Sequence, residues 1–236
     1  MSIVAARRKS VMARIAQAIL GPSSGFCPIF NRPKWIPLEF AKRTRGMTLL
    51  AMTMMGVFMT NYAHAKTATA IFAGGCFWCM ESEFQEKPGI SAVVSGYTGG
   101  DEKTARYELV SSKKTDHVEA VEVTYDPAKV SYEQLLEIYW GNIDPTDAGG
   151  QFYDRGKHYS TAIFYGSEEE KKLAEASKAK VEAKLGKAVA TRIEPRKPFF
   201  AAEAEHQDFY QTNPGHYNRY VEGSGRKEKL KEIWNK

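Results

Sequence analysis

The sequence predicts an α+β fold, a two-layer sandwich in which helices cover one face of a mixed β-sheet. Residues 66–236 alternate between short apolar segments with strand patterns and longer segments with helical spacing, in the order β-α-β-β-α-β-α-β. The length of this part suits one domain with one hydrophobic core. The whole chain of 236 residues is 43% hydrophobic and 26% charged, which excludes a fully disordered chain and a multi-pass membrane protein.

The first six predicted elements match the split βαβ, or ferredoxin-like, unit. The apolar strand 68–73 ends at a glycine pair, and the helix expected over 76–84 stops before a Pro-Gly turn. Strand 90–97 leads to a second glycine pair, and a polar loop is expected over 101–116. Strand 117–125 alternates apolar and polar side chains, which indicates one buried face.

The second half of the domain carries equally local signals. Ser131 caps a helix expected to end at Trp140, and a long loop precedes the strand expected over 159–165. A long charged helix over 167–185 is closed by Gly186. The remaining predicted parts are short: a strand at 188–193, a helix near 203–210 and an irregular C-terminal segment.

Residues 1–65 differ from the rest of the chain in charge. They hold nine Lys or Arg residues and one acidic residue, whereas the chain as a whole carries +5. The remainder is therefore slightly acidic, and this balance gives no reason to expect nucleic-acid binding.

The same segment has the organisation of a secretory signal. Lys42, Arg43 and Arg45 precede an uncharged apolar run over 47–59, and a small-x-small pattern ends at Ala65. The run is shorter than the roughly 20 residues that a stable membrane anchor needs. We therefore predict a targeting region over 1–65 with cleavage after Ala65, and export to the periplasm. An uncleaved anchor in the inner membrane is the alternative.

The chemistry is expected at a glycine pair that is followed by Cys76 and Cys79. Three cysteines in the whole chain are too few for a disulfide-stapled scaffold. Cys76 falls in the first turn of the predicted helix, where free N–H groups and the helix dipole favour an anion. This placement predicts a lowered thiol pKa and a nucleophilic thiolate. Cys79 lies on the same helical face, so the two sulfurs could bridge.

Other uses of this cysteine pair are less well supported. A structural disulfide across so small a ring constrains little of the unfolded chain. A zinc site needs two more ligands, and the histidines of residues 66–236 lack the paired spacing of such sites. A thioredoxin-type dithiol is the serious alternative because Cys-x-x-Cys is its signature, although Phe77-Trp78 is not the small, proline-containing pair usual there.

The segment Gly75-Cys76-Phe77-Trp78, followed by Met80-Glu81, resembles the signature of the class A peptide methionine sulfoxide reductases. Residues downstream match the active-site positions of that family with the same spacing: Tyr107, Glu119, Asp154 and Tyr159. Two further segments are similar to family motifs, Trp140 to Pro145 and Glu203 with His206-Gln207. The chain departs from the family in two places. It has Cys79 where the family commonly has glycine, and it lacks the resolving cysteines that the family often carries near the C-terminus.

The resemblance implies that residues 66–236 are a catalytic domain that reduces methionine S-sulfoxide, protein-bound and free, to methionine, as protein repair under oxidative stress. Cys76 would attack sulfur and become a sulfenic acid, and Glu119 would act as the acid once burial had raised its pKa. From its strand pattern alone, Glu119 equally fits a solvent-facing position. The expected substrate-binding residues are Phe77 and Trp78 for the methyl group, Tyr107 and Tyr159 for the oxygen, and Asp154 for a water or the oxygen site.

Recycling of the sulfenic acid is expected to use Cys79 as the resolving residue. The alternative is direct attack by an external thiol, with Cys79 a bystander. We expect no bound cofactor or metal, a thioredoxin-like protein as reductant (dithiothreitol in vitro), oxidised proteins or peptides as substrates, and a monomer. Two rival functions remain at this point, a periplasmic Cys-x-x-Cys thiol-disulfide oxidoreductase and a non-enzymatic peptide-binding module.

Overall fold

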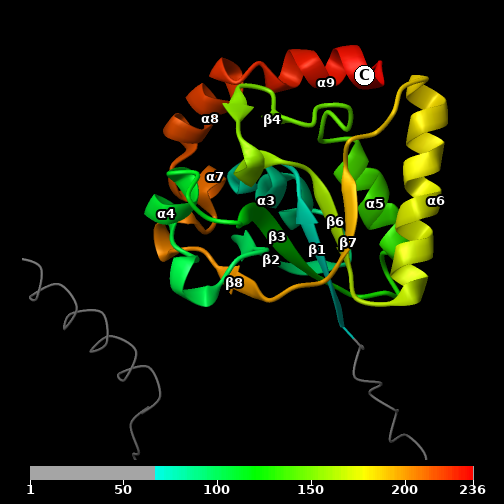
Figure 1. The fold of residues 1–236 in the computed structure, drawn as a ribbon, viewed down its shortest axis with the longest axis horizontal. Helices are drawn as coiled ribbons and strands as arrows, with labels where there is room; N and C mark the ends of the chain where they lie inside the picture. The colour runs from blue at the N-terminus through cyan, green and yellow to red at the C-terminus, as the bar shows by residue number, and fades with distance from the viewer. Residues whose placement is uncertain (1–66, 236) are drawn as a thin grey trace, which may run out of the picture. The chain divides into compact units, whose positions relative to one another are not determined.

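A six-stranded β-sheet with the order β7-β6-β1-β3-β2-β8 lies at the centre of the computed structural model, which describes residues 67–235 (Figure 1). Its strands are β1 (Ala68–Ala73), β2 (Ile90–Thr98), β3 (Val118–Tyr125), β6 (Ala162–Tyr165), β7 (Arg192–Pro195) and β8 (Phe199–Ala201). Neighbouring strands are antiparallel, except that β6 and β7 are parallel. The short strands β4 (Gly150–Gln151) and β5 (Asp154–Arg155) form a separate hairpin. The predicted α+β fold with a mixed sheet is confirmed.

The inner four strands, β6-β1-β3-β2, stand in the order of a split βαβ unit. β1 occupies the centre, where Phe72 lies opposite Val121 of β3 on one side and Ile163 of β6 on the other. This register sends Phe72 toward the helices and its neighbour Ile71 toward the opposite face, because successive side chains of a strand alternate. The ferredoxin-like core expected from the order of elements is therefore present.

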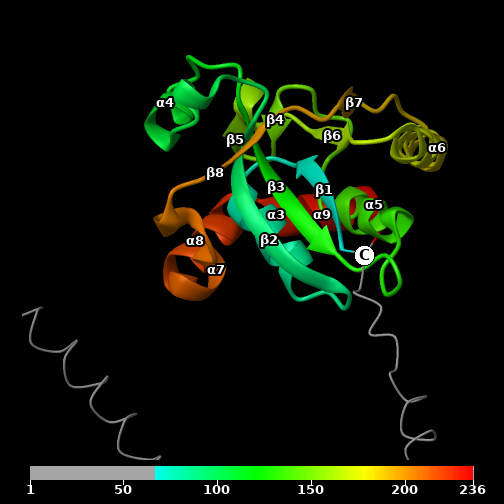
Figure 2. The same ribbon diagram turned by 90° about the horizontal axis from the view of Figure 1, so that it is seen from below.

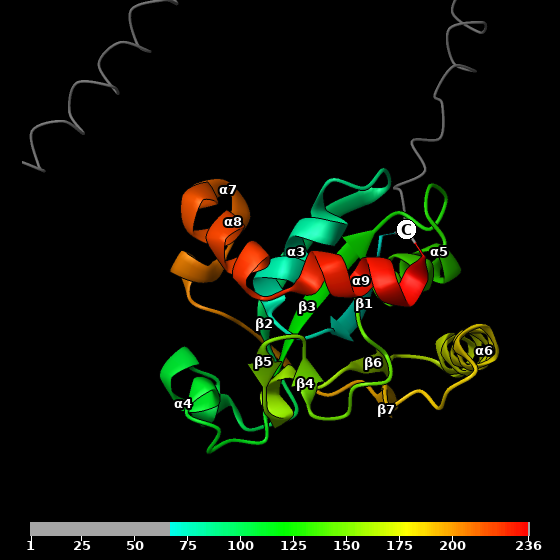
Figure 3. The same cartoon turned by 90° about the horizontal axis from the view of Figure 1, so that it is seen from above.

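Helices α3 (Phe77–Gln85) and α5 (Tyr132–Trp140) cover one face of the sheet, and α9 (Arg226–Trp234) crosses the same side (Figure 3). α6 (Glu168–Leu185) lies at the β7 end of the sheet, whereas α7 (Phe209–Thr212) and α8 (Pro214–Gly223) lie at the β2 end (Figures 1 and 2). The C-terminal helices thus lie near α3, whose N-terminal end carries the two cysteines.

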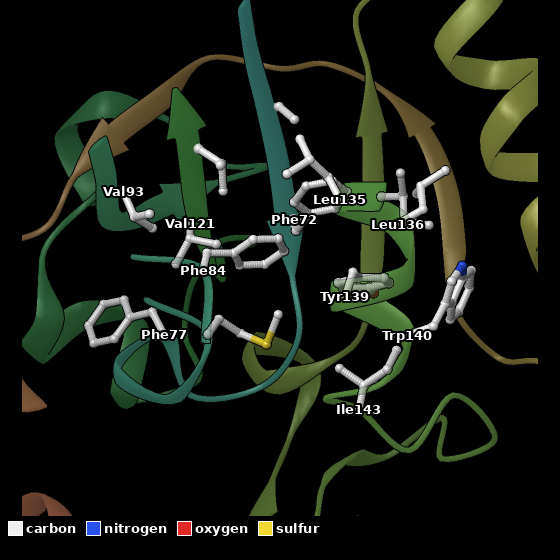
Figure 4. Close-up of a cluster of buried hydrophobic side chains, with 14 of the residues drawn as sticks. Phe72, Phe77, Phe84, Val93, Val121, Leu135, Leu136, Tyr139, Trp140 and Ile143 are labelled. Carbon is white, nitrogen blue, oxygen red and sulfur yellow. The ribbon is translucent and has the colours of Figure 1, made fainter. Parts of the chain in front are cut away.

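The main hydrophobic core lies between the sheet and helices α3 and α5 (Figure 4). Phe72 stacks on Phe84 at 5.4 Å and on Tyr139 at 5.2 Å between ring centroids. The Tyr139 hydroxyl donates to the carbonyl of Ala73 at 2.9 Å, so the polar end of this buried ring is satisfied. Burial of these large apolar surfaces holds α3 against the sheet.

Local sequence signals determine the ends of two helices. Ser131 and Gln134 form a complete capping box at the start of α5. Ser167 accepts a hydrogen bond from the backbone of Glu170 at the start of α6, and Gly186 ends that helix with a φ of 62°. These boundaries confirm the predictions made from the serine and glycine positions.

Four predicted segments differ from the structure. Residues 101–116 are not wholly a loop, because a turn at Glu102–Thr104 and helix α4 (Tyr107–Ser111) lie within them. The strand expected over 159–165 begins only at Ala162, after a 3₁₀ turn at Lys157–Tyr159. The strand expected over 188–193 lies instead at β7, since the N–H of Ala190 bonds to Pro145 and ladder pairing with β6 starts at Arg192.

The fourth difference is the C-terminal segment, for which the prediction of irregular structure is wrong. It forms α8 and α9. The short helix expected near 203–210 is a 3₁₀ turn at Ala204–His206 followed by α7, and the edge strand β8 precedes them. Pro214 starts α8, a position where proline suits a helix because its missing N–H is not needed. The helical pattern of Tyr217, Tyr220, Val221 and Ser224, spaced three, four and seven residues from the first, was a signal for this helix.

The predicted signal segment and its cleavage site after Ala65 lie outside the described residues. Within residues 67–235, none of the helices has both the length and the hydropathy needed to cross a membrane.

Candidate active site

Helix α3 begins at a sharp turn made by two glycines. Gly75 has a φ of 84°, and a Cβ atom at this position would lie 2.6 Å from the Cβ of Gln151. The turn makes Cys76 the N-cap residue, with a non-helical ψ of 122°. The Cys76 carbonyl still accepts hydrogen bonds from Cys79 at 3.2 Å and from Met80 at 3.3 Å. Cys76 is therefore the residue immediately before the first turn of the helix.

The two thiols of this helix start meet each other. Cys76 and Cys79 are both free and buried, and each thiol shifts the pKa of the other. They occupy the N-cap and N3 positions, the same pair of positions whose side chains and backbone meet in a capping box.

The prediction that the helix N-terminus lowers the pKa of Cys76 is wrong in this setting. Burial raises the pKa of the Cys76 thiol well above its ordinary value, and the neighbouring Cys79 and Glu119 add to the increase. The pKa of Cys79 is lowered, first by the hydrogen bond from Cys76 and further by the charge of Arg226. The two thiols therefore differ: burial favours the protonated form of Cys76, and Cys79 is the more acidic of the pair.

Glu119 lies on β3 and faces the cysteines. Only 2% of its surface is exposed, so the solvent-facing alternative does not hold. The backbone N–H of Phe77 donates to its Oε2 at 3.0 Å. Burial nevertheless raises the pKa of Glu119 to about 8, and the charges of Asp154 and Cys79 contribute to the rise. At neutral pH this carboxyl is mostly protonated and can donate a proton.

Two phenol groups lie in the same cluster. Tyr107 is the first residue of α4, and Tyr159 ends the 3₁₀ turn before β6. Burial raises the pKa of both hydroxyls, and the charges of Glu119 and Cys76 raise each of them further. Both phenols therefore remain hydrogen-bond donors over the physiological pH range, beside the thiol and the carboxyl.

Asp154 of β5 reaches the cluster from the hairpin. Its carboxylate accepts a short hydrogen bond from the hydroxyl of Tyr220, which comes from α8. Burial raises the pKa of Asp154, while Tyr220 and Arg226 oppose the rise. The Tyr220 hydroxyl also lies near the Cys76 thiol and is among the groups that oppose the rise of its pKa. Tyr220 thus connects Asp154 with the sulfur.

The two aromatic residues after Cys76 occupy different environments. Phe77 is 1% exposed and packs against Tyr97 and His206, so it belongs largely to the core (Figure 4). Trp78 is partly exposed, stacks on Phe209 at 3.7 Å, and donates from its ring nitrogen to Nδ1 of His206 at 3.2 Å. Burial lowers the pKa of His206, which keeps its ring neutral and able to accept this bond.

Glu203 ties the tyrosines of this region together. Its carboxylate accepts from the Tyr97 hydroxyl and from the backbone N–H of Tyr107, each at 2.9 Å. The second bond satisfies a free N–H at the start of α4 and sets where Tyr107 stands. Glu203 and His206, which the sequence marks through its late motif, are therefore supports of the site.

All eight sequence-predicted site residues come together in the structure: Cys76, Phe77, Trp78, Cys79, Tyr107, Glu119, Asp154 and Tyr159. The sequence analysis missed Tyr217, Tyr220 and Arg226, which α8 and α9 bring over the start of α3 (Figure 3). Across residues 67–235, no group of three or more His, Cys, Asp or Glu side chains is placed to hold a metal ion.

Comparison with known proteins gives one consistent result. The family model for peptide methionine sulfoxide reductase matches residues 68–236. The peptide methionine sulfoxide reductase MsrA of Bacillus subtilis is 53% identical over 171 residues, which cover 72% of this chain and 97% of that protein. The protein of the same name from Bacillus velezensis is 52% identical with the same coverage. The crystal structure of reduced Mxr1 from Saccharomyces cerevisiae matches with a TM-score of 0.61 and 30% identity, covering 64% of this chain and 87% of that one.

Proposed function

Because the chain belongs to the peptide methionine sulfoxide reductase family and is a peptide-methionine (S)-S-oxide reductase, we propose that Cys76 and Glu119 perform the reduction and that Cys79 completes the cycle. The observation that carries this proposal is the contact set around the start of α3. A nucleophilic sulfur stands beside a buried carboxyl that is protonated at neutral pH, and Phe77 N–H holds that carboxyl in place.

The surroundings of Cys76 suit a methyl sulfoxide. The partly exposed ring of Trp78, held by Phe209 and His206, offers an apolar surface for the methyl group. The hydroxyls of Tyr107 and Tyr159 are donors for the sulfoxide oxygen, and Glu119 is the acid next to them. These contacts favour sulfoxide chemistry over protein disulfide exchange, which has no use for an acid aimed at an oxygen.

The reduction transfers one oxygen atom. The Cys76 sulfur attacks the sulfoxide sulfur while the Glu119 proton passes to the oxygen. The bond between substrate sulfur and oxygen breaks, an S–O bond forms on Cys76, and methionine leaves. The methionine sulfur gains two electrons and the Cys76 sulfur loses two. The former thiol proton of Cys76 replaces the one that Glu119 gave, so the carboxyl is restored.

Recycling begins from the Cys76 sulfenic acid. The sulfur of Cys79 attacks the Cys76 sulfur, forms a disulfide and displaces the oxygen, which leaves as water after it takes a proton. A dithiol protein of the thioredoxin class then supplies two electrons and two protons and restores both cysteines. The mutual effect of the two buried thiols on their pKa values supports this order, because it requires the two side chains to lie near each other.

The substrates that we propose are oxidised proteins outside the cytoplasm, together with free methionine S-sulfoxide. Export is supported by the basic, apolar and small-x-small sequence of residues 42–65. Production of the full chain with a C-terminal tag in a Gram-negative host tests this. We expect the protein in the osmotic-shock fraction with Lys66 as its first residue. A full-length protein in the cytosol would argue against export, and a membrane-bound full-length form would indicate an uncleaved anchor.

The catalytic proposal is tested by incubating the purified full chain with the S or the R epimer of methionine sulfoxide and dithiothreitol. Methionine should form from the S epimer alone, and Cys76→Ser should form none. Methionine production by the Cys76→Ser variant would remove Cys76 from the proposed role.

A further inference from the structure

Arg226 is a buried cation at the start of α9. It is 5% exposed, and its guanidinium donates to the carbonyl of Asn142. The same group lies 3.7 Å from the sulfur of Met80 and 4.9 Å from the ring centroid of Phe152. None of these partners is an anion, and across the described residues no carboxylate forms an ion pair with Arg226. A buried charge without a counter-ion is costly, so a nearby negative group is expected.

The group that meets this requirement is the thiol next to Met80 in the chain. The charge of Arg226 lowers the pKa of Cys79, and the hydroxyl of Tyr217 from α8, which bonds Ser82, lies near the same sulfur. Asp154 of β5 also feels the charge of Arg226 and accepts from Tyr220, and measurements that read the Cys79 thiol directly separate the two partners. Cys76 lies on the other side of the dithiol, beside Glu119 of β3.

We propose that Arg226 is the counter-ion of a Cys79 thiolate, and that this charge pair makes Cys79 the attacking sulfur during recycling. The inference rests on the proposed resolving role of Cys79. Arg226 is a positioning residue in this scheme, since it acts through Cys79 and touches neither the substrate nor the Cys76 sulfur.

The chemical step follows from the charge pair. The Cys79 thiolate attacks the sulfur of the Cys76 sulfenic acid, an S–S bond forms and the S–O bond breaks. The displaced hydroxide takes a proton from Glu119 and leaves as water, and solvent returns a proton to Glu119. Cys76 and Cys79 then share one disulfide, and the two-electron oxidation of Cys76 has become the oxidation of the pair.

The same pair explains why the disulfide should be easy to reduce. In the disulfide, Cys79 carries no charge, and Arg226 loses its counter-ion. The reduced state therefore gains an ionic interaction that the oxidised state lacks, which raises the reduction potential. A thioredoxin-class dithiol can then reduce the bridge, and Arg226 serves both the formation and the removal of the bond.

A direct measurement of the Cys79 pKa tests the proposal. The chain has three cysteines, so in a Cys27→Ser, Cys76→Ser background the ultraviolet absorbance of the thiolate against pH reports Cys79 alone. We expect a midpoint below the ordinary cysteine value of about 8.5. A midpoint at or above that value overturns the proposal without any change at Arg226.

Variants at Arg226 supply the second arm. In the same background, Arg226→Gln should raise the midpoint by about one unit or more, and Arg226→Lys should restore part of the shift because it keeps the charge. With Cys76 present, Arg226→Gln should prolong the dimedone-reactive sulfenic acid by about tenfold at neutral pH, since a tenfold smaller thiolate fraction attacks. The first equivalent of methionine should form as before.

The control is Arg219→Gln, which removes an exposed arginine of α8. It should change neither the midpoint nor the lifetime of the sulfenic acid. A folded Arg226→Gln protein with an unchanged midpoint and an unchanged sulfenic acid lifetime contradicts the role of Arg226. Failure of the resolving role itself is recognised separately, because Cys79→Ser would then sustain normal turnover with a thioredoxin-class donor.

Discussion

The backbone N–H of Phe77 and the carboxyl Oε2 of Glu119 are joined by a buried hydrogen bond of 3.0 Å. This bond links the first residue of α3 to the second residue of β3, and so it places an acid beside the sulfur that the preceding residue carries. One carboxyl oxygen is occupied by the backbone, which leaves the other to hold the proton that a sulfoxide oxygen needs.

Replacement of the acid should separate binding from chemistry. Glu119→Gln can still accept from Phe77 N–H through its amide oxygen, but it has no acidic proton. We expect the single-turnover rate of methionine formation to fall by about 10²-fold or more, with a smaller change in substrate binding. Glu122→Gln, on the same strand but partly exposed, should turn over normally. A near-normal rate for Glu119→Gln would place the acid elsewhere.

The first turnover should slow as the pH rises. The pKa of Glu119 is about 8, and Cys76 stays a thiol because its own pKa is raised well above the ordinary value. The competent carboxyl is therefore present below about pH 8 and is lost above it, with a rate decrease of about tenfold per pH unit. Rapid-quench measurements across this range should show the alkaline decline in the wild type and none in Glu119→Gln. A rate that increases through pH 8 would contradict this assignment.

Loss of Cys79 should affect recycling and spare the first turnover. In Cys79→Ser the Cys76 thiol and the acid both remain, so one equivalent of methionine should form at the normal rate. Turnover with a thioredoxin-like donor should collapse, and dimedone should trap the sulfenic acid. Mass spectrometry of the wild type after one equivalent of sulfoxide should show a loss of two hydrogens in the peptide with both cysteines. Persistent sulfenic acid in the wild type would leave Cys79 as a packing residue.

Tyr220→Phe should weaken the reductive step. The change keeps the ring that packs edge-on against Trp78 at 5.8 Å, but removes the hydroxyl that donates to Asp154. Because the Asp154 carboxylate then loses the donor that holds it in the site, the single-turnover rate should fall by about tenfold. Tyr210→Phe, which loses an exposed bond to Gln211, is the matched control. Equal rates for the two variants would argue against a role for the Tyr220 hydroxyl.

The parts of the fold that sequence predicts well are those set by neighbouring residues. The serine caps of α5 and α6, the glycine that closes α6 and the glycine turn before Cys76 all act within a few positions. Helix α4 is different, because Glu203 satisfies the N–H of Tyr107 from 96 residues away. No local pattern contains that partner, so the segment looks like a polar loop.

The site shows the same division. The resemblance of motifs located Glu119, Asp154 and both tyrosines, and the structure brings them to Cys76. The pKa of Cys76 could not be inferred from its place at a helix start, because burial, Cys79 and a carboxyl from β3 outweigh the helix terminus. Tyr220 and Arg226 were missed because the segment that carries them was predicted to be irregular.

Because α8 and α9 complete this site, the order in which the chain is synthesised determines when the site forms. Arg226 contacts Met80 across 146 positions of the chain, and a polypeptide is made from its N-terminus onward. The sulfurs therefore emerge early, while Tyr220 and Arg226 arrive only with the last helices. A product that stalled or was clipped before α8 would expose a reactive dithiol without the groups that tune it, so the site is complete only after α9 has been made.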